Sequence, residues 1–161
     1  MKSLSLLLLV CLLQGCPQEE VRSDGKDWRY KYTDELTNRL ELVELLSEMR
    51  NGYENKSVET LVALASKSFY EKSGTADTSD DYDYYRLRHV LDKNFKMAKQ
   101  ITIDIRLRSM KIIGEVAEIN YYHVTRFLIS NEAGEKWVAV DDESQMRLAR
   151  EGGKWKVLNG L

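Results

Sequence analysis

The hydrophobic period of the chain changes once, near Gln100, and this change limits the folds that are open to it. Before Gln100, apolar residues recur at three- and four-residue steps, which is typical of amphipathic helices. After Gln100, apolar and polar residues alternate, as in Ile101, Ile103 and Ile105, which is typical of strands with one buried face. Helices followed by consecutive strands predict an α+β domain in which helices cover one face of an antiparallel sheet.

Three helices are expected before the change of period. The first is about 16 residues long, ends at Gly52, and carries a wide apolar stripe. That stripe consists of Leu36, Leu40, Leu42, Val43, Leu45, Leu46 and Met49. The second helix begins at Ser57 as its N-cap and runs past Phe69 towards Gly74. The third follows a polar loop with Ser79 as its cap, and its apolar positions are Tyr84, Leu87, Val90, Leu91 and Phe95.

About four strands are expected after the change, in a curved antiparallel sheet. The expected strand segments are 101–108, 116–129, 136–150 and 154–158, with turns in 109–114, 131–134 and 151–153. In the second segment one face by parity carries Ala117, Ile119, Tyr121, His123 and Thr125.

Composition points to an ordinary globule. The chain has 161 residues, a net charge of −2, 43% hydrophobic and 31% charged residues, which suits one soluble domain. The near-balanced charge gives no electrostatic reason to expect nucleic-acid binding. Metal sites with paired His or Cys, nucleophile elbows and glycine-rich phosphate loops are missing from the sequence, so no cofactor or metal is expected.

Four aspartates at 77, 80, 81 and 83 raise the question of a calcium loop. The EF-hand pattern also requires a glycine for the turn and a glutamate at its twelfth position, and neither stands in place here. A helix cap with a solvated loop is therefore the favoured interpretation.

The N-terminus predicts export. Residues 1–15 form a signal peptide, with Lys2 before an apolar stretch that is too short to span a bilayer. Residues 13–16, LQGC, resemble the bacterial lipobox, and this resemblance implies cleavage before Cys16 and a diacylglycerol on its sulfur. An ordinary cleaved signal that leaves a free thiol is the alternative, but Cys11 would be removed and Cys16 would have no partner. Pro17 in place of Asp then implies the outer membrane, facing the periplasm, in a host with two membranes.

Residues 16–33 are expected to be a tether between the lipidated Cys16 and a domain that spans residues 34–161. Trp28, Tyr30 and Tyr32 alternate with basic residues in this tether. They predict either a short strand that docks on the domain, which is favoured, or an aromatic lead into the first helix.

The order of elements over residues 34–161 resembles the nuclear transport factor 2-like superfamily, also called the cystatin-like cone. Two segments carry the resemblance: GEVAEI at 114–119 is similar to the family's glycine-led entry to its long strand, and GGKWKV at 152–157 to its closing turn. The resemblance implies a cone whose mouth lies between sheet and helices, with the Ala117-to-Thr125 face directed inward.

Candidate pocket residues follow from that inward face. They are Tyr121, His123 and Thr125, with Asp142 brought near by the neighbouring strand. A His with a carboxylate partner can act as a general base, but a hydrogen-bonded structural His is the favoured interpretation. An aromatic set is also available to a pocket wall, namely Tyr82, Tyr84, Tyr85, Tyr121 and Tyr122.

The favoured function is non-enzymatic. A lipid-anchored cone in the cell envelope would bind a small apolar or amphipathic ligand, or an envelope protein. The alternatives are an isomerase- or dehydratase-like enzyme that uses His123 and Asp142, and a structural role as a homodimer.

Overall fold

The computed structural model describes residues 28–72, 78–132 and 134–161. The predicted signal peptide, Cys16, the first part of the tether and Asp77 lie outside the described residues. The chain divides into two compact units, residues 1–35 and 36–161, and the second contains the whole sheet.

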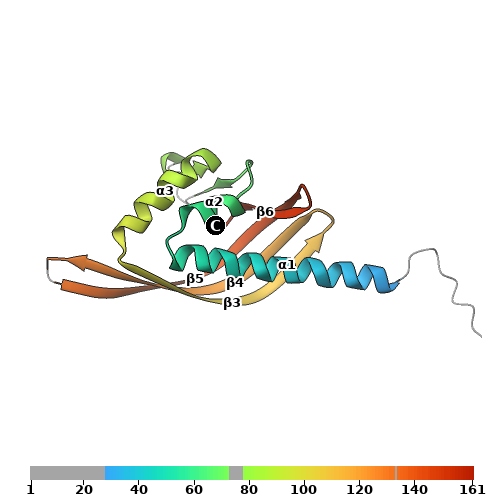
Figure 1. Cartoon of the computed structure of the whole chain (residues 1–161), viewed down its shortest axis with the longest axis horizontal. Coiled ribbons are helices and arrows are strands. Elements are labelled where there is room, and N and C mark those ends of the chain that lie inside the picture. The colour runs from blue at the N-terminus through green and yellow to red at the C-terminus, as the bar shows by residue number, and fades with distance from the viewer. Residues whose placement is uncertain (1–27, 73–77, 133) are drawn as a thin grey trace, which may run out of the picture. The chain divides into compact units, whose positions relative to one another are not determined.

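The predicted fold class is confirmed: helices are followed by a four-stranded antiparallel sheet in the order β3-β4-β5-β6 (Figure 1). The helices are α1 (Trp28–Glu54), α2 (Val58–Leu64) and α3 (Tyr84–Met97). The strands of the main sheet are β3 (Gln100–Ile113), β4 (Val116–Asn131), β5 (Gly134–Glu151) and β6 (Lys154–Asn159). Between α2 and α3, β1 (Tyr70–Glu71) and β2 (Tyr82–Asp83) form a small second sheet beside a 3-10 turn at Thr78–Asp80.

Helix α1 is longer than expected at both ends. It begins at Trp28, so the strand expected around Trp28, Tyr30 and Tyr32 is wrong and the segment leads into the helix. Gly52 does not end it either. A Cβ atom at Gly52 would lie 2.7 Å from Leu61 Cδ2, so glycine is needed here because α2 packs closely against α1 rather than because the helix stops.

The apolar stripe of α1 is only partly buried. Leu42, Leu45, Leu46 and Met49 belong to the core, whereas Leu36, Leu40 and Val43 are exposed. The prediction of one inward stripe is wrong for these three residues, because the stripe is wider than the face of α1 that the domain covers.

Helix α2 begins as predicted and ends early. The Ser57 side chain accepts a hydrogen bond from the Thr60 amide at 3.3 Å and so caps the helix. The helix ends at Leu64 because Ala65 forms a bridge with Val157 of β6, and the Ser66 amide donates to the Val157 carbonyl at 2.8 Å. The prediction that it continues past Phe69 is wrong, although Phe69 is fully buried.

Asp83, not Ser79, caps helix α3. Its Oδ1 accepts hydrogen bonds from the Tyr85 and Arg86 amides at 3.1 and 3.0 Å, while Ser79 lies in the preceding 3-10 turn. The expected apolar positions Leu87, Leu91 and Phe95 are buried.

The long strands alternate as predicted, with one correction. Strand β3 continues to Ile113 through a register shift between Leu107 and Ser109, so the turn expected in 109–114 shrinks to its last positions. Gly114 occupies this turn with φ +57°. Gly152 and Gly153, with φ +55° and +80°, make the predicted turn into β6.

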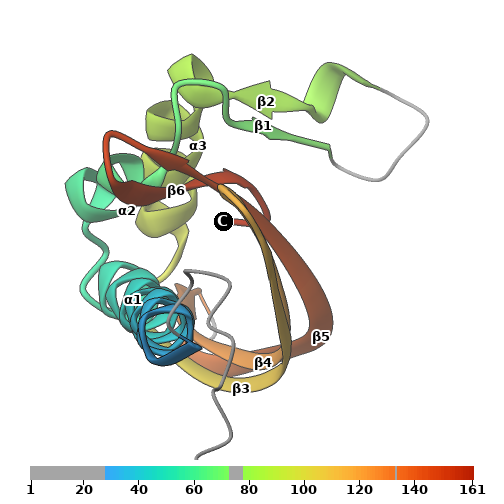
Figure 2. The same cartoon turned by 90° about the vertical axis from the view of Figure 1, so that its right-hand side faces the viewer.

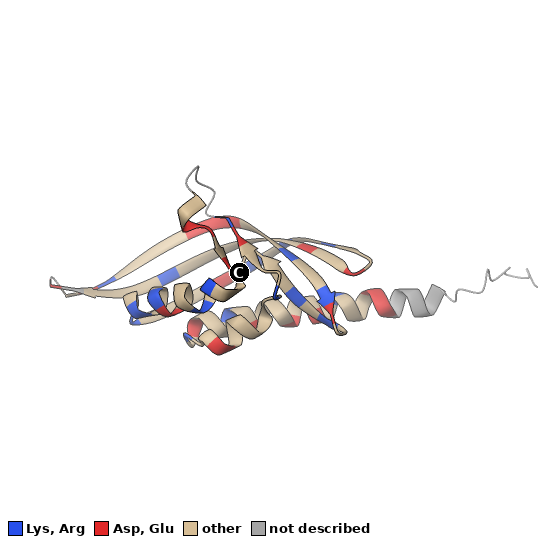
Figure 3. Cartoon of the chain, turned by 90° about the horizontal axis from the view of Figure 1, so that it is seen from above, with Lys and Arg blue, Asp and Glu red and all other residues tan. Residues whose placement is uncertain are grey.

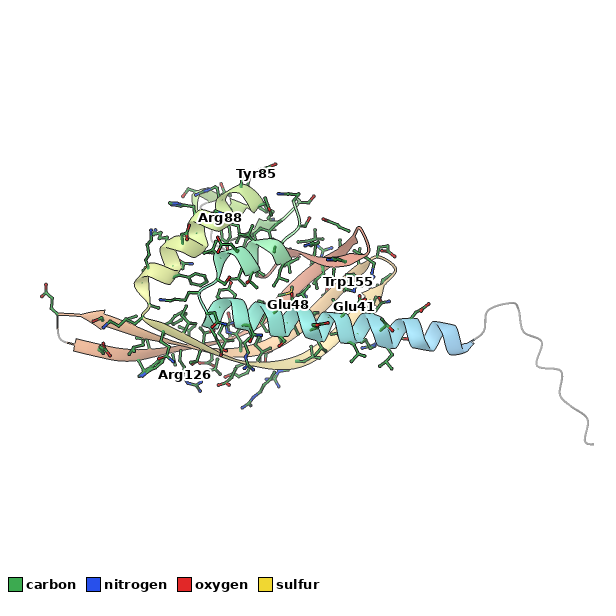
Figure 4. The ribbon with its side chains drawn as sticks, viewed as in Figure 1. Glu41, Glu48, Tyr85, Arg88, Arg126 and Trp155 are labelled. Carbon is green, nitrogen blue, oxygen red and sulfur yellow. The ribbon has the colours of Figure 1, made fainter. Side chains whose placement is uncertain are left out.

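The sheet curves around a core that the helices close (Figure 2). Arg150 links α1 to β6: it donates a hydrogen bond to Glu41 Oε2 at 2.6 Å, and its guanidinium lies 4.8 Å from the centre of the Trp155 ring. Figure 4 labels Glu41 and Trp155. Acidic and basic residues are interspersed along the helices and strands (Figure 3). Of the helices in the described ranges, none is both long and apolar enough to cross a membrane.

Candidate functional site

A cavity of about 940 Å³ lies between the end of α1, helix α3 and the inner face of the sheet. Its wall is mainly apolar. The apolar and aromatic side chains that line it are Met49, Tyr53, Tyr82, Phe95, Met97, Ala98, Ile101, Ile103, Ile105, Tyr121, Phe127, Ile129, Val138 and Leu161. A cavity of this size and composition suits a small, mainly apolar molecule.

Strand β4 supplies the floor of the cavity through its alternation. Ala117 and Ile119 are packed into the core, and the next inward positions line the cavity. Three of the four predicted pocket residues are therefore brought together: Tyr121, His123 and Thr125.

Asp142 is the exception among the predicted pocket residues. It pairs in register with His123, but its side chain is exposed and accepts a hydrogen bond from the Glu143 amide at 2.8 Å, and it does not line the cavity. Strand β6 pairs with β5 only along Arg147–Glu151, so β5 is an open edge at Asp142 and the carboxylate faces solvent.

A general base would pair His123 with a carboxylate, but the partner of His123 is the hydroxyl of Thr125. Its Nδ1 lies 3.1 Å from Thr125 Oγ1, and its ring lies beside Tyr121 with centroids 5.9 Å apart. Between the described side chains of His123 and Asp142 there is no hydrogen bond or ion pair. The geometry matches a hydrogen-bonded His in a cavity wall.

Three tyrosines and one glutamate give the cavity its polar end. Burial is the main cause that raises the pKa of Tyr53, with nearby Tyr82, Tyr121 and Glu71 raising it further. Burial also raises the pKa of Tyr82 to about 12 and shifts the pKa of Tyr121 upward. All three phenols therefore keep their protons at neutral pH and act as hydrogen-bond donors.

Glu71 holds the last residues of the chain against this polar end. Its Oε2 accepts a hydrogen bond from the Gly160 amide at 2.6 Å, and the Tyr121 hydroxyl donates to the Gly160 carbonyl at 3.2 Å. Burial raises the pKa of the Glu71 carboxyl, while hydrogen bonds from the Gly160 and Leu161 amides oppose the shift. Gly160 and Leu161 thereby become part of the cavity wall.

The predicted aromatic set is split by the structure. Tyr82 and Tyr121 line the cavity, whereas Tyr85 is 81% exposed and Tyr122 donates to Asp141 at 3.1 Å. Tyr53 and Glu71 were not among the predicted site residues. Tyr53 follows the buried Met49 by four residues, so the helical period contained a signal for it; nothing in the sequence around Glu71 indicates its role.

Within the described ranges, no group of three or more His, Cys, Asp or Glu side chains is arranged to hold a metal ion. Asp83, from the sequence cluster of aspartates, caps α3 instead. Asp81 accepts a hydrogen bond from the Tyr70 hydroxyl at 2.8 Å.

Solved structures share this architecture. One is an NTF2-like protein with a cystatin-like fold from Novosphingobium aromaticivorans, with a TM-score of 0.66, 13% identity, and coverage of 81% of this chain and 83% of that one. The residues 36–161 have the nuclear transport factor 2-like (NTF2-like) fold. No family model and no curated protein sequence matches the chain.

Other neighbours of the NTF2-like domain differ in what is known of them. A conserved protein from Planctomyces limnophilus has a TM-score of 0.66 at 10% identity, over 76% of this chain and 92% of its own. A hexachlorocyclohexane dehydrochlorinase (LinA) type 2 has a TM-score of 0.65 at 14% identity, over 79% and 84%. At these identities the likeness concerns the NTF2-like fold alone.

Proposed function

We propose that this chain is a non-enzymatic binding protein of the cell envelope, whose NTF2-like domain holds a small, mainly apolar molecule. The observation that carries the proposal is the cavity of about 940 Å³ with its apolar wall. Cavities of this kind bury most of a small ligand and orient it through a few polar groups.

The polar end of the cavity selects the chemistry of the part of the ligand that reaches it. The phenols of Tyr53 and Tyr82 offer protons, so a neutral oxygen acceptor such as a carbonyl or ether suits them, whereas Tyr121 donates its proton to the Gly160 carbonyl. The nearby Glu71 carboxylate disfavours an anion at the same place.

An isomerase- or dehydratase-like activity is the second candidate, and the observation that favours it is His123 in the cavity wall. General base catalysis would also need a carboxylate or another group that orients the ring. The exposed position of Asp142 and the contact of His123 with Thr125 support binding rather than catalysis.

Binding is tested with 1-dodecanol, an apolar chain with a neutral oxygen, and the full chain carrying Cys16→Ser. Titration calorimetry is expected to show saturable binding. Thr125→Phe, which adds a ring at a buried inward position, is expected to weaken it about tenfold or more, or about 1.4 kcal/mol. Val124→Phe adds the same ring on the other face of β4 and is the matched control. Equal binding by both variants, or no saturable binding by the parent, would contradict the proposal.

We also propose that a lipid on Cys16 holds the protein at the outer membrane, facing the periplasm in a host with two membranes. The LQGC sequence at 13–16 supports it, and two or three acyl chains suffice for stable anchoring. In a bacterial host fed labelled palmitate, the mature protein is expected to carry label. Cys16→Ser should lose the label and Cys11→Ser should keep it; label that survives Cys16→Ser would overturn the anchor.

A further inference from the structure

We infer that the ligand is an amphiphile with an anionic head group, and that lysines beside the cavity hold this head. The inference rests on the proposed function, because it assumes that the apolar part of the ligand occupies the cavity. It goes further in naming a charge on the ligand and the side chains that recognise it.

A second hollow, of about 560 Å³, adjoins the cavity at the end of α3. Phe95, Met97 and Ala98 line both of them. Met97 is 62% exposed and lines both hollows. A ligand that leaves the cavity across Met97 reaches the second hollow directly.

The second hollow is basic. Lys56, Lys96 and Lys99 line it, against the single acid Asp92. Such an excess of ammonium groups beside an apolar cavity favours a carboxylate or another anion.

Lys56 is fixed in place by the fold. Its backbone has a φ of +52°, a left-handed conformation that costs a non-glycine residue free energy. Its Nζ donates to the carbonyls of Ala98 and Lys99 at 3.1 and 3.3 Å, just beyond the end of α3. The ammonium thereby offsets the negative end of the helix, which would otherwise repel an anion.

Lys96 is the lysine best placed to take the head group. Lys99 Nζ already pairs with Glu135 Oε1 at 2.5 Å, whereas no ion pair joins Lys96 to the part of the chain that the structure describes. Lys96 is exposed in the last turn of α3.

The cavity itself argues for a head group outside it. The carboxylate of Glu71 belongs to its wall, and no Lys or Arg is among the described residues that line it. Glu143 also borders the cavity, but its carboxylate is exposed and accepts hydrogen bonds from Arg108 at 3.1 and 2.9 Å. An anion inside would lose hydration and face the like charge of Glu71. The favourable arrangement therefore places the apolar chain in the cavity and the anion over the lysines.

The test compares dodecanoate with 1-dodecanol, which have the same chain length and differ in charge. Calorimetric titrations at low ionic strength use the full chain with Cys16→Ser. Dodecanoate is expected to bind about fivefold or more tightly than dodecanol. Lys96→Glu should remove that preference and leave dodecanol binding unchanged. Lys93→Glu, an equal charge reversal on α3 at an exposed residue outside the second hollow, should keep it.

Equal affinity of the parent for both ligands, or equal losses in the two lysine variants, would overturn the inference and leave cavity binding intact. Saturable binding of neither ligand would overturn the proposed function, and the inference with it.

Discussion

The inner face of β4 has two halves with the same alternation of inward and outward residues, but one half packs into the core and the other borders a cavity. In the first half Ala117 and Ile119 are packed into the core, with 1% and 0% of their surface exposed. In the second half Thr125 and Phe127 line a cavity. Alternation decides which side chains point inward in both halves, but it does not decide whether anything fills the space in front of them.

The covering elements make the difference. Strand β6 extends the sheet only beside Arg147–Glu151 of β5, and its Val157 is fully buried in the core with Met146 and Leu148. Beyond that point the sheet continues without β6, and the helix residues that face it do not fill the space in front of it. A cavity therefore forms where long strands extend past the short elements that cover them.

The largest expected effect is a difference in the free energy of unfolding that is lost when a side chain is truncated in the packed half or in the cavity half. Leu148→Ala, in the packed half, should lower the free energy of unfolding by about 2–5 kcal/mol because it leaves a void in a closed core. Phe127→Ala should cost clearly less, because Phe127 is only partly buried and already borders open space. Urea unfolding monitored by circular dichroism measures both, and equal losses would break the comparison.

Close packing between α1 and α2 gives the next effect. Gly52→Ala would place a Cβ atom 2.7 Å from Leu61 Cδ2 and 2.9 Å from Leu61 Cγ, and Leu61 is fully buried. We expect a loss of about 1–3 kcal/mol from overpacking, larger than the gain in helix propensity.

The same urea experiment on Gly52→Ala combined with Leu61→Ala provides the control. Because the second change removes the clashing atoms, the double variant should lose less stability than the sum of the single variants. A stabilised Gly52→Ala single variant would show that the contact between the helices is loose.

A smaller effect should appear in the pH dependence. Burial raises the pKa of Glu71 above its ordinary value of 4.5. The folded chain then keeps a proton that the unfolded chain has lost, so stability from this group is present below the ordinary pKa and falls as pH rises through the raised one. Glu71→Gln removes the titrating group, so the stability of the variant relative to the parent should increase as pH rises above 4.5. Denaturant midpoints over a pH series check this, and a constant difference would refute it.

The smallest effect is expected on the outer face of the sheet. Arg126, which Figure 4 labels, has its Nη1 atom 2.7 Å from Asp104 Oδ2, and both side chains are exposed. Exposed ion pairs add little to stability, so Arg126→Ala should leave the urea midpoint within experimental error of the parent. A shift comparable to that of Leu148→Ala would mean that the outer face is buried in an assembly.

The sequence predicted the elements better than their ends. The period of two after Gln100 identified the sheet, and parity placed Tyr121, His123 and Thr125 correctly on the inner face. The ends of α1 and α2 could not be predicted from the positions of glycines. Gly52 is required by the close packing of the Leu61 side chain and does not end α1, and α2 ends where Ala65 forms a bridge with β6.

The site was harder to predict than the fold for a related reason. Asp142 was placed near His123 from strand pairing, and the pairing is correct, but its exposure depends on how far β6 extends. Glu71 lines the cavity and accepts a hydrogen bond from the Gly160 amide, 89 residues away in sequence. Contacts between residues so distant in sequence leave no local pattern to read.

The central claim is that the open half of β4 faces a cavity that takes a small apolar ligand. Methyl-resolved NMR of the full chain with Cys16→Ser, titrated with 1-dodecanol, tests it most directly. Saturable shifts are expected for the methyl groups of Ile103, Ile105 and Ile129, which line the cavity, with Leu148 and Val157 unchanged. Shifts that do not saturate, or that fall equally on Leu148 and Val157, would contradict it.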